Sequence, residues 1–224
     1  MTATMILFRH MLAGRHVILT ASALLCVQIA NAQGIWSKTG GIPSVEAAAG
    51  QNVFSPNAKR FVRATREGLR LGNSTDGSLQ PLPTAAFPPL WEVVWAPDSK
   101  RVAVNFSDGG AVGTWDADIF EIDSAGHLMV FRLSERVRNA AKSFPICESP
   151  EDVNVALVGW SARGDAALLV AEVPPHSSCK NMGALRGFMV SLTSKKILEV
   201  MPESLLRRKW AKVIGERLLI SSRK

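Results

Sequence analysis

The chain has 224 residues, of which 47% are hydrophobic and 20% are charged, and a formal net charge of +7. Beyond an N-terminal leader its length suits one domain of ordinary size, which buries a core without depending on metal ions or several disulfides. The excess charge is at one end, because residues 203–224 contain seven basic and two acidic residues, whereas residues 33–202 contain 17 of each. This distribution gives no support to a nucleic-acid-binding body, and we expect no nucleic-acid partner.

The first 32 residues have the features of a secretory signal peptide. Arg9 and Arg15 precede an apolar run from Val17 to Ile29, and Ala30-Asn31-Ala32 is a small-x-small cleavage site. The alternative is a membrane anchor, but the uninterrupted apolar run is about 14 residues, shorter than the roughly 20 that span a bilayer as a helix. We therefore expect cleavage near Ala32 and a secreted, periplasmic protein.

Two cysteines, Cys147 and Cys179, remain after that cleavage. In an oxidising compartment an even pair indicates a disulfide. A redox or metal pair would need a close Cys-x-x-Cys motif or histidines at fixed offsets. His176 lies three residues before Cys179, but one such pair does not complete a tetrahedral metal site. We expect a structural disulfide, no metal and no cofactor.

Residues 33–50 are rich in Gly, Ala and Ser and are expected to form a flexible lead-in. Three copies of one short stretch then organise residues 51–202. Phe54-Ser55-Pro56-Asn57-Ala58-Lys59-Arg60 aligns with Trp95-Ala96-Pro97-Asp98-Ser99-Lys100-Arg101, and Trp160-Ser161-Ala162-Arg163-Gly164-Asp165 keeps the aromatic anchor but not the proline. Pro presets φ at the second turn position, and Asn or Asp suits the third. The pattern predicts a tight turn between a buried aromatic anchor (Phe54, Trp95 or Trp160) and an apolar strand.

A second pair of predicted strands, joined by a polar turn, follows each copy. These pairs are Gly68 to Gly72 with Leu79 to Leu82, Asp118 to Asp123 with Leu128 to Phe131, and Gly187 to Leu192 with Ile197 to Val200. Short strands separated by turns indicate antiparallel sheets. Counting the apolar runs that enter the turns, each unit has about four strands, and the first two anchors are 41 residues apart, a spacing typical of β-propeller blades.

These units resemble the Trp-Ser-Pro-Asp-Gly-Lys repeats of TolB-type WD-like propellers, which also continue through a strand like Asp118-Ile119-Phe120. The resemblance covers residues 54–200 and implies an all-β fold of four-stranded blades. It departs from the family in the third copy, which lacks Pro and Asp, and in the first two, which lack Gly. Because a closed propeller needs about four blades or more, we expect an open or irregular arc covered by the C-terminal segment. The alternatives are a fourth irregular unit or a second chain that completes the ring.

The basic segment of residues 203–224 has the pattern of an amphipathic helix from Glu203 to Leu219, although Gly215 weakens the prediction. Leu206, Trp210, Ile214 and Leu218 recur every four residues. The cations lie largely elsewhere on the circumference: Arg207, Arg208, Lys209 and Lys212. The segment either packs on the last sheet or contacts an anionic membrane surface.

No group of residues in the sequence has the types and spacing of a recognisable catalytic site. Around Ser161 the sequence nearly imitates a nucleophile elbow, but the glycine comes three residues after the serine instead of two. The densest acidic group does not match a calcium loop and alternates like a half-buried strand: Asp108, Asp116, Asp118, Glu121 and Asp123. Trp115, beside a Gly-rich stretch, is the one tryptophan for which an exposed position is credible.

We therefore expect a non-enzymatic β-repeat interaction module that binds a protein or peptide through loops at one end of the blades. The candidate residues in these loops are Asp108, Trp115, Asp116, Asp118, His176 and Asn181. One alternative is a small secreted hydrolase of saccharides or peptides that uses Asp116 and Asp118. Another is a peripheral membrane protein that binds through the basic tail. The sequence is also compatible with an oligomer.

Overall fold

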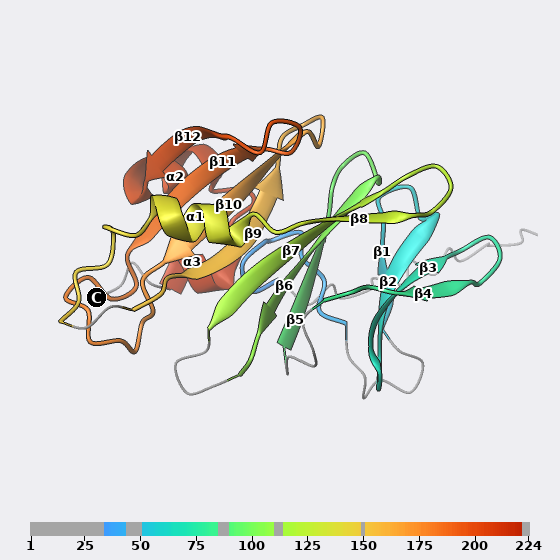
Figure 1. Cartoon of the computed structure of the whole chain (residues 1–224), viewed down its shortest axis with the longest axis horizontal. Helices are drawn as coiled ribbons and strands as arrows, with labels where there is room; N and C mark the ends of the chain where they lie inside the picture. The colour runs from blue at the N-terminus through green and yellow to red at the C-terminus, as the bar shows by residue number, and fades with distance from the viewer. Residues whose placement is uncertain (1–33, 44–50, 85–89, 110–113, 149–150, 221–224) are drawn as a thin grey trace, which may run out of the picture. The chain divides into compact units, whose positions relative to one another are not determined.

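The computed structural model describes residues 34–43, 51–84, 90–109, 114–148 and 151–220 (Figure 1). The predicted signal peptide lies outside these residues. The described residues contain three antiparallel sheets of four strands, which makes the protein an all-β, propeller-like fold, as predicted. No sheet among the described residues closes into a barrel.

Each sheet is one blade, and its strands pair in sequence order. Blade 1 contains β1 (Val53–Phe54), β2 (Arg60–Thr65), β3 (Gly68–Asn73) and β4 (Leu79–Pro81). Blade 2 contains β5 (Leu90–Trp95), β6 (Arg101–Ser107), β7 (Trp115–Ile122) and β8 (Leu128–Phe131). Blade 3 contains β9 (Asn154–Trp160), β10 (Ala166–Glu172), β11 (Leu185–Ser191) and β12 (Ile197–Pro202). The predicted hairpins are therefore confirmed.

The three repeat turns share one conformation, which explains why the motif recurs. In each turn a backbone N–H donates over 2.8–3.0 Å to the carbonyl three residues earlier: Ala58 to Ser55, Ser99 to Ala96, and Gly164 to Ser161. These three donors have φ angles of 55°, 59° and 72°. Positive φ suits glycine and costs other residues about 1–2 kcal/mol, so the first two turns hold this conformation against local strain.

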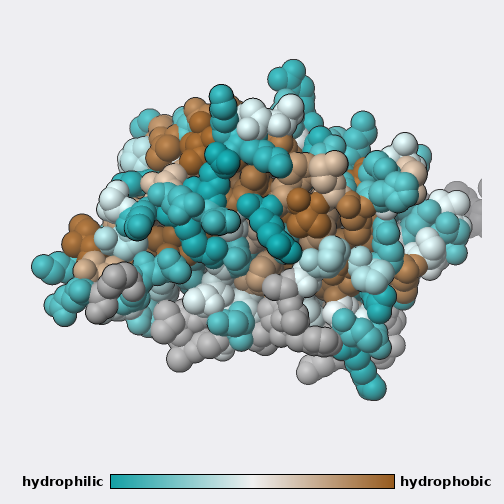
Figure 2. All heavy atoms as spheres, viewed as in Figure 1, coloured by the Kyte–Doolittle hydropathy of each residue, from teal (hydrophilic) through white to brown (hydrophobic). Residues whose placement is uncertain are grey.

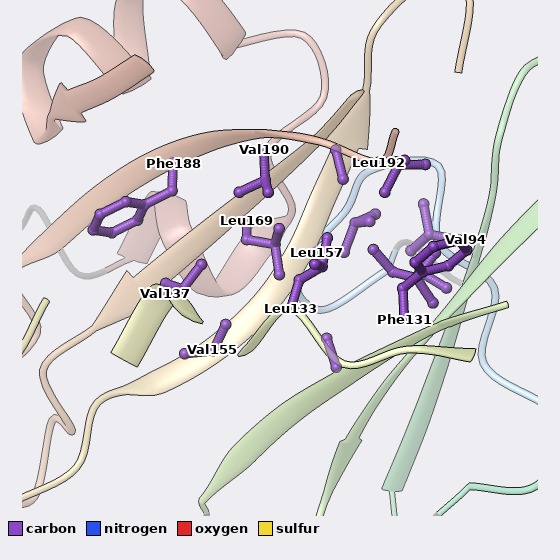
Figure 3. Close-up of a cluster of buried hydrophobic side chains, with 14 of the residues drawn as sticks. Val94, Phe131, Leu133, Val137, Val155, Leu157, Leu169, Phe188, Val190 and Leu192 are labelled. Atoms are coloured by element: carbon purple, nitrogen blue, oxygen red, sulfur yellow. The ribbon is translucent and has the colours of Figure 1, made fainter. Parts of the chain in front are cut away.

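Two apolar clusters fill the space between neighbouring blades. Val62 and Leu71 of blade 1 pack with Val93 and Phe120 of blade 2. Between blades 2 and 3, residues such as Leu157 form a larger cluster, part of which Figure 3 shows. Helix α1 (Ser134–Ala140), in the long connection between these two blades, adds its buried Val137 to that cluster. Side chains alternate along each strand, so each blade has two faces, and those of blade 2 lie toward blade 1 and toward blade 3.

The aromatic anchors lie on the face toward the preceding blade. Trp95 is 8% exposed in the cluster between blades 1 and 2, and Trp160 is 9% exposed in the cluster between blades 2 and 3. Phe54 is 52% exposed, so the prediction that it is buried is wrong. The physical reason is its place in the series: no described blade precedes blade 1, and the ring has no neighbouring sheet against which to pack.

The C-terminal segment covers the far face of blade 3. It forms two helices, α2 (Glu203–Trp210) and α3 (Glu216–Ile220), instead of one continuous helix. Leu206 and Leu218 are fully buried against this blade, as a packing helix requires. Residues 211–215 separate the two helices, and this break includes Gly215, whose N–H donates to the carbonyl of Trp36 at 2.7 Å and where a Cβ would meet the Ile35 carbonyl oxygen at 2.6 Å. No described helix is long and apolar enough to cross a membrane.

Residues 34–43 belong to the packed domain, although their composition suggested a flexible lead-in. The side chain of Trp36 is fully buried, and two isolated bridges hold the segment: Ser37 with Ile214, and Gly41 with Val93. The Arg217 guanidinium lies 4.9 Å from the Trp36 ring. The lead-in therefore joins β5 of blade 2 to the C-terminal segment.

Candidate functional site

The loops predicted to bind a partner connect β6 with β7 and β10 with β11, at the end of the blades opposite the repeat turns. In the first loop, Thr114 donates to the Asp108 carboxylate over 2.8 Å, and residues 110–113 lie outside the described residues. Trp115 is only 3% exposed, and its ring lies edge-on to Trp36 at 5.7 Å. The structure therefore excludes the exposed position considered for Trp115, because Trp36 of the lead-in packs against its ring.

The two carboxylates of the hydrolase alternative are both engaged by arginine. Asp116 accepts a hydrogen bond from Arg138 at 3.1 Å, and Arg132 lies 3.8 Å from the largely buried Asp118. Burial raises the pKa of Asp118 to about 6, while Arg132 lowers it and Asp116 adds to the rise. One carboxyl is therefore shifted toward its protonated form beside another, which is the feature that keeps this alternative open.

The second loop is organised around the predicted disulfide between Cys147 and Cys179, which the structure contains. Asn181 accepts from the Ile146 N–H at 2.8 Å and donates to the Phe144 carbonyl at 2.9 Å. Its side-chain amide therefore joins the same two segments as the disulfide. His176 is exposed. Such a disulfide is typical of an oxidising environment.

The sulfur atoms of this disulfide and a Glu151 carboxylate oxygen lie within 4.8 Å of one another. Metal ligation by cysteine requires thiolates, and both sulfur atoms are used in the disulfide. The Glu151 carboxylate also accepts hydrogen bonds from the N–H and the hydroxyl of Ser178. In the oxidised protein these three residues therefore have a structural role and do not form a metal site.

The cations proposed for membrane contact lie on and just after helix α2. Arg207 bonds to Glu203 and to the Leu218 carbonyl, and Lys209 lies 2.7 Å from Glu199. Arg208 and Lys212 are exposed. Because Leu206 is used in the core, an interaction with lipid would depend on these charges without the apolar stripe.

The uncovered face of blade 1 is the surface that the fold leaves without a neighbour among the described elements. Val62, Ala64, Leu69 and Leu71 point toward blade 2, so the alternate residues of β2 and β3 lie on the other face. The strand register extends this face to β1 and β4. We call it the open face and define it by six side chains: Phe54, Phe61, Arg63, Arg70, Leu79 and Pro81.

Aromatic and cationic groups lie together on the open face. The Phe54 and Phe61 rings are 5.6 Å apart, and the Arg63 guanidinium lies 5.2 Å from the Phe61 ring. Gly72, opposite Phe61 in the ladder, leaves room for the ring, since a Cβ there would meet it at 2.2 Å. Phe54 and its neighbours on this face therefore form a small cluster outside the three main ones.

The charge of the open face is predominantly positive. Arg63 donates to the Asn52 side chain at 2.8 Å. Within the described residues, the acidic contact of these arginines is Glu67, 3.9 Å from Arg70. An ion pair of this length between a half-buried arginine and an exposed glutamate contributes little, so both guanidinium groups retain most of their attraction for an external carboxylate.

A pocket of about 330 Å³ lies where the three repeat turns meet. We call it the hub pocket. All three anchors line it, so the motif brings Phe54, Trp95 and Trp160 to one place. Val53, Pro56 and Pro97 add further apolar walls, and Thr39 and Val213 come from the lead-in and the tail. Phe54 belongs to both the open face and the hub pocket, which makes them continuous.

Other hollows and apolar spots are less suited to recognition. A hollow of about 560 Å³ between the turns of blades 1 and 2 has opposite charges on its walls, among them Lys59, Lys100 and Asp123. Figure 2 shows hydrophobic side chains at the surface over β8 and β12, where Met129 is 60% and Leu198 61% exposed. These two lie on separate outer strands and line none of the hollows described here.

A buried polar network that the sequence did not reveal joins blades 2 and 3. Asn105 donates to the Glu92 carboxylate and to the Leu157 carbonyl, both at 2.8 Å. The Glu172 carboxylate accepts from Asn154 at 3.0 Å and from Arg217 at 2.7 Å. Glu92, Asn105 and Glu172 are polar residues within largely apolar strands, and this pattern could have indicated a buried network. The sequence does not show which residues are their hydrogen-bond partners.

Comparison with known protein families finds no family that matches the chain, and comparison with curated proteins finds no relative. The functional assignment therefore depends on the fold and on the surfaces described above.

Proposed function

We propose that the protein is a non-enzymatic binding module of an oxidising, extracytoplasmic compartment, and that it binds a protein partner through the open face of blade 1. One observation carries the proposal: the far face of blade 3 is covered by α2 and α3, whereas no described element covers the corresponding face of blade 1. Repeat arrays need a cap at each end, so an uncovered end favours a partner.

The chemistry of the open face indicates an acidic partner with apolar side chains. Phe54 and Leu79 are 52% and 42% exposed, and Arg63 and Arg70 lie beside them. Aromatic and arginine side chains are the groups enriched at binding hot spots. A carboxylate that pairs with either guanidinium while its neighbours cover Phe54 would satisfy both components of this surface.

A second copy of the chain fits the open face poorly. Two open faces brought together about a two-fold axis would bring the positive charges of both copies into one interface. Closing a ring with the far face of blade 3 is blocked, because Leu206 and Leu218 of the C-terminal helices occupy that face. We therefore assign the open face to a different protein.

The compartment and the family belong to the same proposal. The Cys147–Cys179 disulfide supports an oxidising environment, and the signal peptide at residues 1–32 would deliver the chain there. The shared turn conformation and the four-stranded blades support a distant relation to TolB-type WD-like repeats.

A displayed library of random peptides, selected on the folded protein, tests the binding function. We expect enriched peptides to combine acidic and apolar residues and to lose about tenfold or more in affinity for Arg63→Glu/Arg70→Glu, the cost of roughly one lost ion pair at an interface. The matched control is Arg136→Glu/Lys142→Glu, which makes the same change of charge at exposed positions on and after α1. Equal loss in both double variants, or no enrichment of acidic peptides, contradicts the proposal.

The second candidate function is the hydrolase, which the raised pKa of Asp118 beside Asp116 favours. Screening glycoside and peptide substrates with the native protein and with Asp116→Asn/Asp118→Asn separates the two functions. Turnover that disappears in the double variant would replace the binding module with an enzyme.

A further inference from the structure

Resting on the proposed function, we propose that the hub pocket receives an aromatic side chain of the acidic partner and that a carboxylate two or three residues away pairs with Arg63. The inference adds an anchoring site to the open face and specifies the arrangement of groups that the partner presents.

The walls of the hub pocket select an aromatic ring. Phe54, Trp95 and Trp160 bring three rings together, and Pro56 and Pro97 add flat apolar surfaces. Aromatic pairs are favourable at centroid separations of about 4.5–7 Å. The volume of about 330 Å³ is at the lower end for ligand pockets, which suits one side chain better than an extended ligand.

The indole of Trp160 provides the second observation. The residue is 9% exposed, and its Nε1–H is buried with no acceptor among the described residues, a property that it shares with Trp36, Trp91 and Trp210. The Trp95 Nε1–H, by contrast, donates to the Val53 carbonyl at 2.9 Å. A buried donor without an acceptor costs roughly 1–3 kcal/mol. Because Trp160 lines the hub pocket, its indole N–H resonance reports on the occupancy of the pocket.

The distance to Arg63 sets the spacing of the carboxylate. The Phe54 ring lies 5.6 Å and the Arg63 guanidinium 5.2 Å from the same Phe61 ring, so they are within about 11 Å of each other. An extended chain advances about 3.3 Å per residue. Two or three residues of partner therefore cover the distance between the pocket and the guanidinium.

Nuclear magnetic resonance with synthetic peptides tests the inference. The probe is a short peptide with Phe and Asp two positions apart, and its controls replace Phe by Ala or Asp by Asn. On ¹⁵N-labelled protein, we expect the Phe-Asp peptide to shift the indole N–H resonance of Trp160, and the alanine peptide to leave it unchanged. Phe54→Ala should weaken binding about tenfold, as expected for loss of a ring contact, whereas Met129→Ala, at an exposed position outside the open face and the hub pocket, should leave it nearly unchanged.

The outcomes separate this inference from the proposed function. If the Phe and Ala peptides bind equally well and Arg63→Glu abolishes both interactions, the open face binds acidic segments but the pocket has no role. If Phe54→Ala leaves binding as unchanged as Met129→Ala does, the pocket is likewise excluded. If Arg63→Glu has no effect on any peptide, the binding function itself is wrong. Because Phe54 is exposed, its replacement by alanine should leave the protein folded, which the same spectra verify.

Discussion

Glu92 gives the sharpest test of the structure, because it is a carboxyl with no exposure on β5, the first strand of blade 2. Its oxygens accept from the Trp36 N–H at 3.1 and 3.2 Å, from the Ser37 N–H at 3.0 Å and from Asn105 Nδ2 at 2.8 Å. The Asn105 amide is oriented by the Leu157 N–H, which donates to its oxygen at 2.7 Å. All of these groups therefore donate hydrogen bonds to the Glu92 carboxylate.

Burial nevertheless dominates the ionisation of Glu92 and raises its pKa to about 7, while the hydrogen bonds lower it in part. In the unfolded chain the pKa is near the ordinary value of 4.5. The folded state therefore binds the proton more tightly than the unfolded state. The contribution of Glu92 to stability is greatest below about pH 4.5, falls as the pH rises toward 7, and then levels off. At about 1.36 kcal/mol per pKa unit, the difference contributes on the order of 3 kcal/mol.

Urea unfolding of the native protein and of Glu92→Gln at several pH values between about 5 and 8 measures this contribution. Glutamine has no ionisation, so its curve should lack most of the fall. The NH2 group of the glutamine would face the N–H groups that donate to Glu92. This mismatch lowers the free energy of unfolding by a similar amount at every pH. The slope with pH, and not the absolute stability, is therefore the quantity to compare.

Asp118 contributes to the slope in the same direction, because its pKa is raised to about 6. Both measurements are best made in an Asp118→Asn background, so that the remaining difference belongs to Glu92. Parallel slopes with and without Glu92 would mean that its carboxyl is not buried as described. The attachment of residues 34–43 to blade 2 would then need revision.

Three further changes test other parts of the fold by urea unfolding. Replacing Cys147 and Cys179 by Ala opens a loop with a sequence separation of 32 and should lower the unfolding free energy by about 3–4 kcal/mol; no change would mean that the disulfide does not form. Ala58→Gly should stabilise by roughly 1 kcal/mol because φ is 55°, whereas Ser99→Gly should gain less because the Ser99 hydroxyl accepts from the Asn57 N–H; equal gains would contradict the contact between turns. Leu206→Ala should cost about 2–5 kcal/mol, and a cost near zero would mean that α2 does not cover blade 3.

The turns and hairpins of the fold could be predicted from the sequence, because the same short turn motif occurs three times. Pro56 and Pro97 set the turns, and the alternation after them sets the strands, so the hairpins follow from short-range chemistry. The disulfide followed from counting cysteines. Helix α2 followed from the spacing of Leu206 and Trp210, and the break at Gly215 is where the pattern was weakest.

Contacts between distant segments could not be predicted, because they depend on which faces meet. Trp115 beside a Gly-rich stretch looked exposed, but Trp36, 79 positions earlier in the chain, covers it. Phe54 fills the same motif position as Trp95, yet only Trp95 has a preceding blade. The repeat specifies where an anchor points, and the number of units determines whether the anchor is buried.

The same reasoning explains how an uncovered blade face is compatible with a stable chain. Phe61 is only 7% exposed although no described sheet covers it, because the Phe54 ring and the Arg63 guanidinium shield it. Arginine buries its apolar stem and delocalised head on aromatic surface while its charge stays hydrated. A covering of this kind keeps the free protein from adhering through its open face to apolar surfaces in general. A carboxylate would pair with the same arginine, so the shielding of Phe61 and the proposed selectivity for an acidic partner would have the same physical origin.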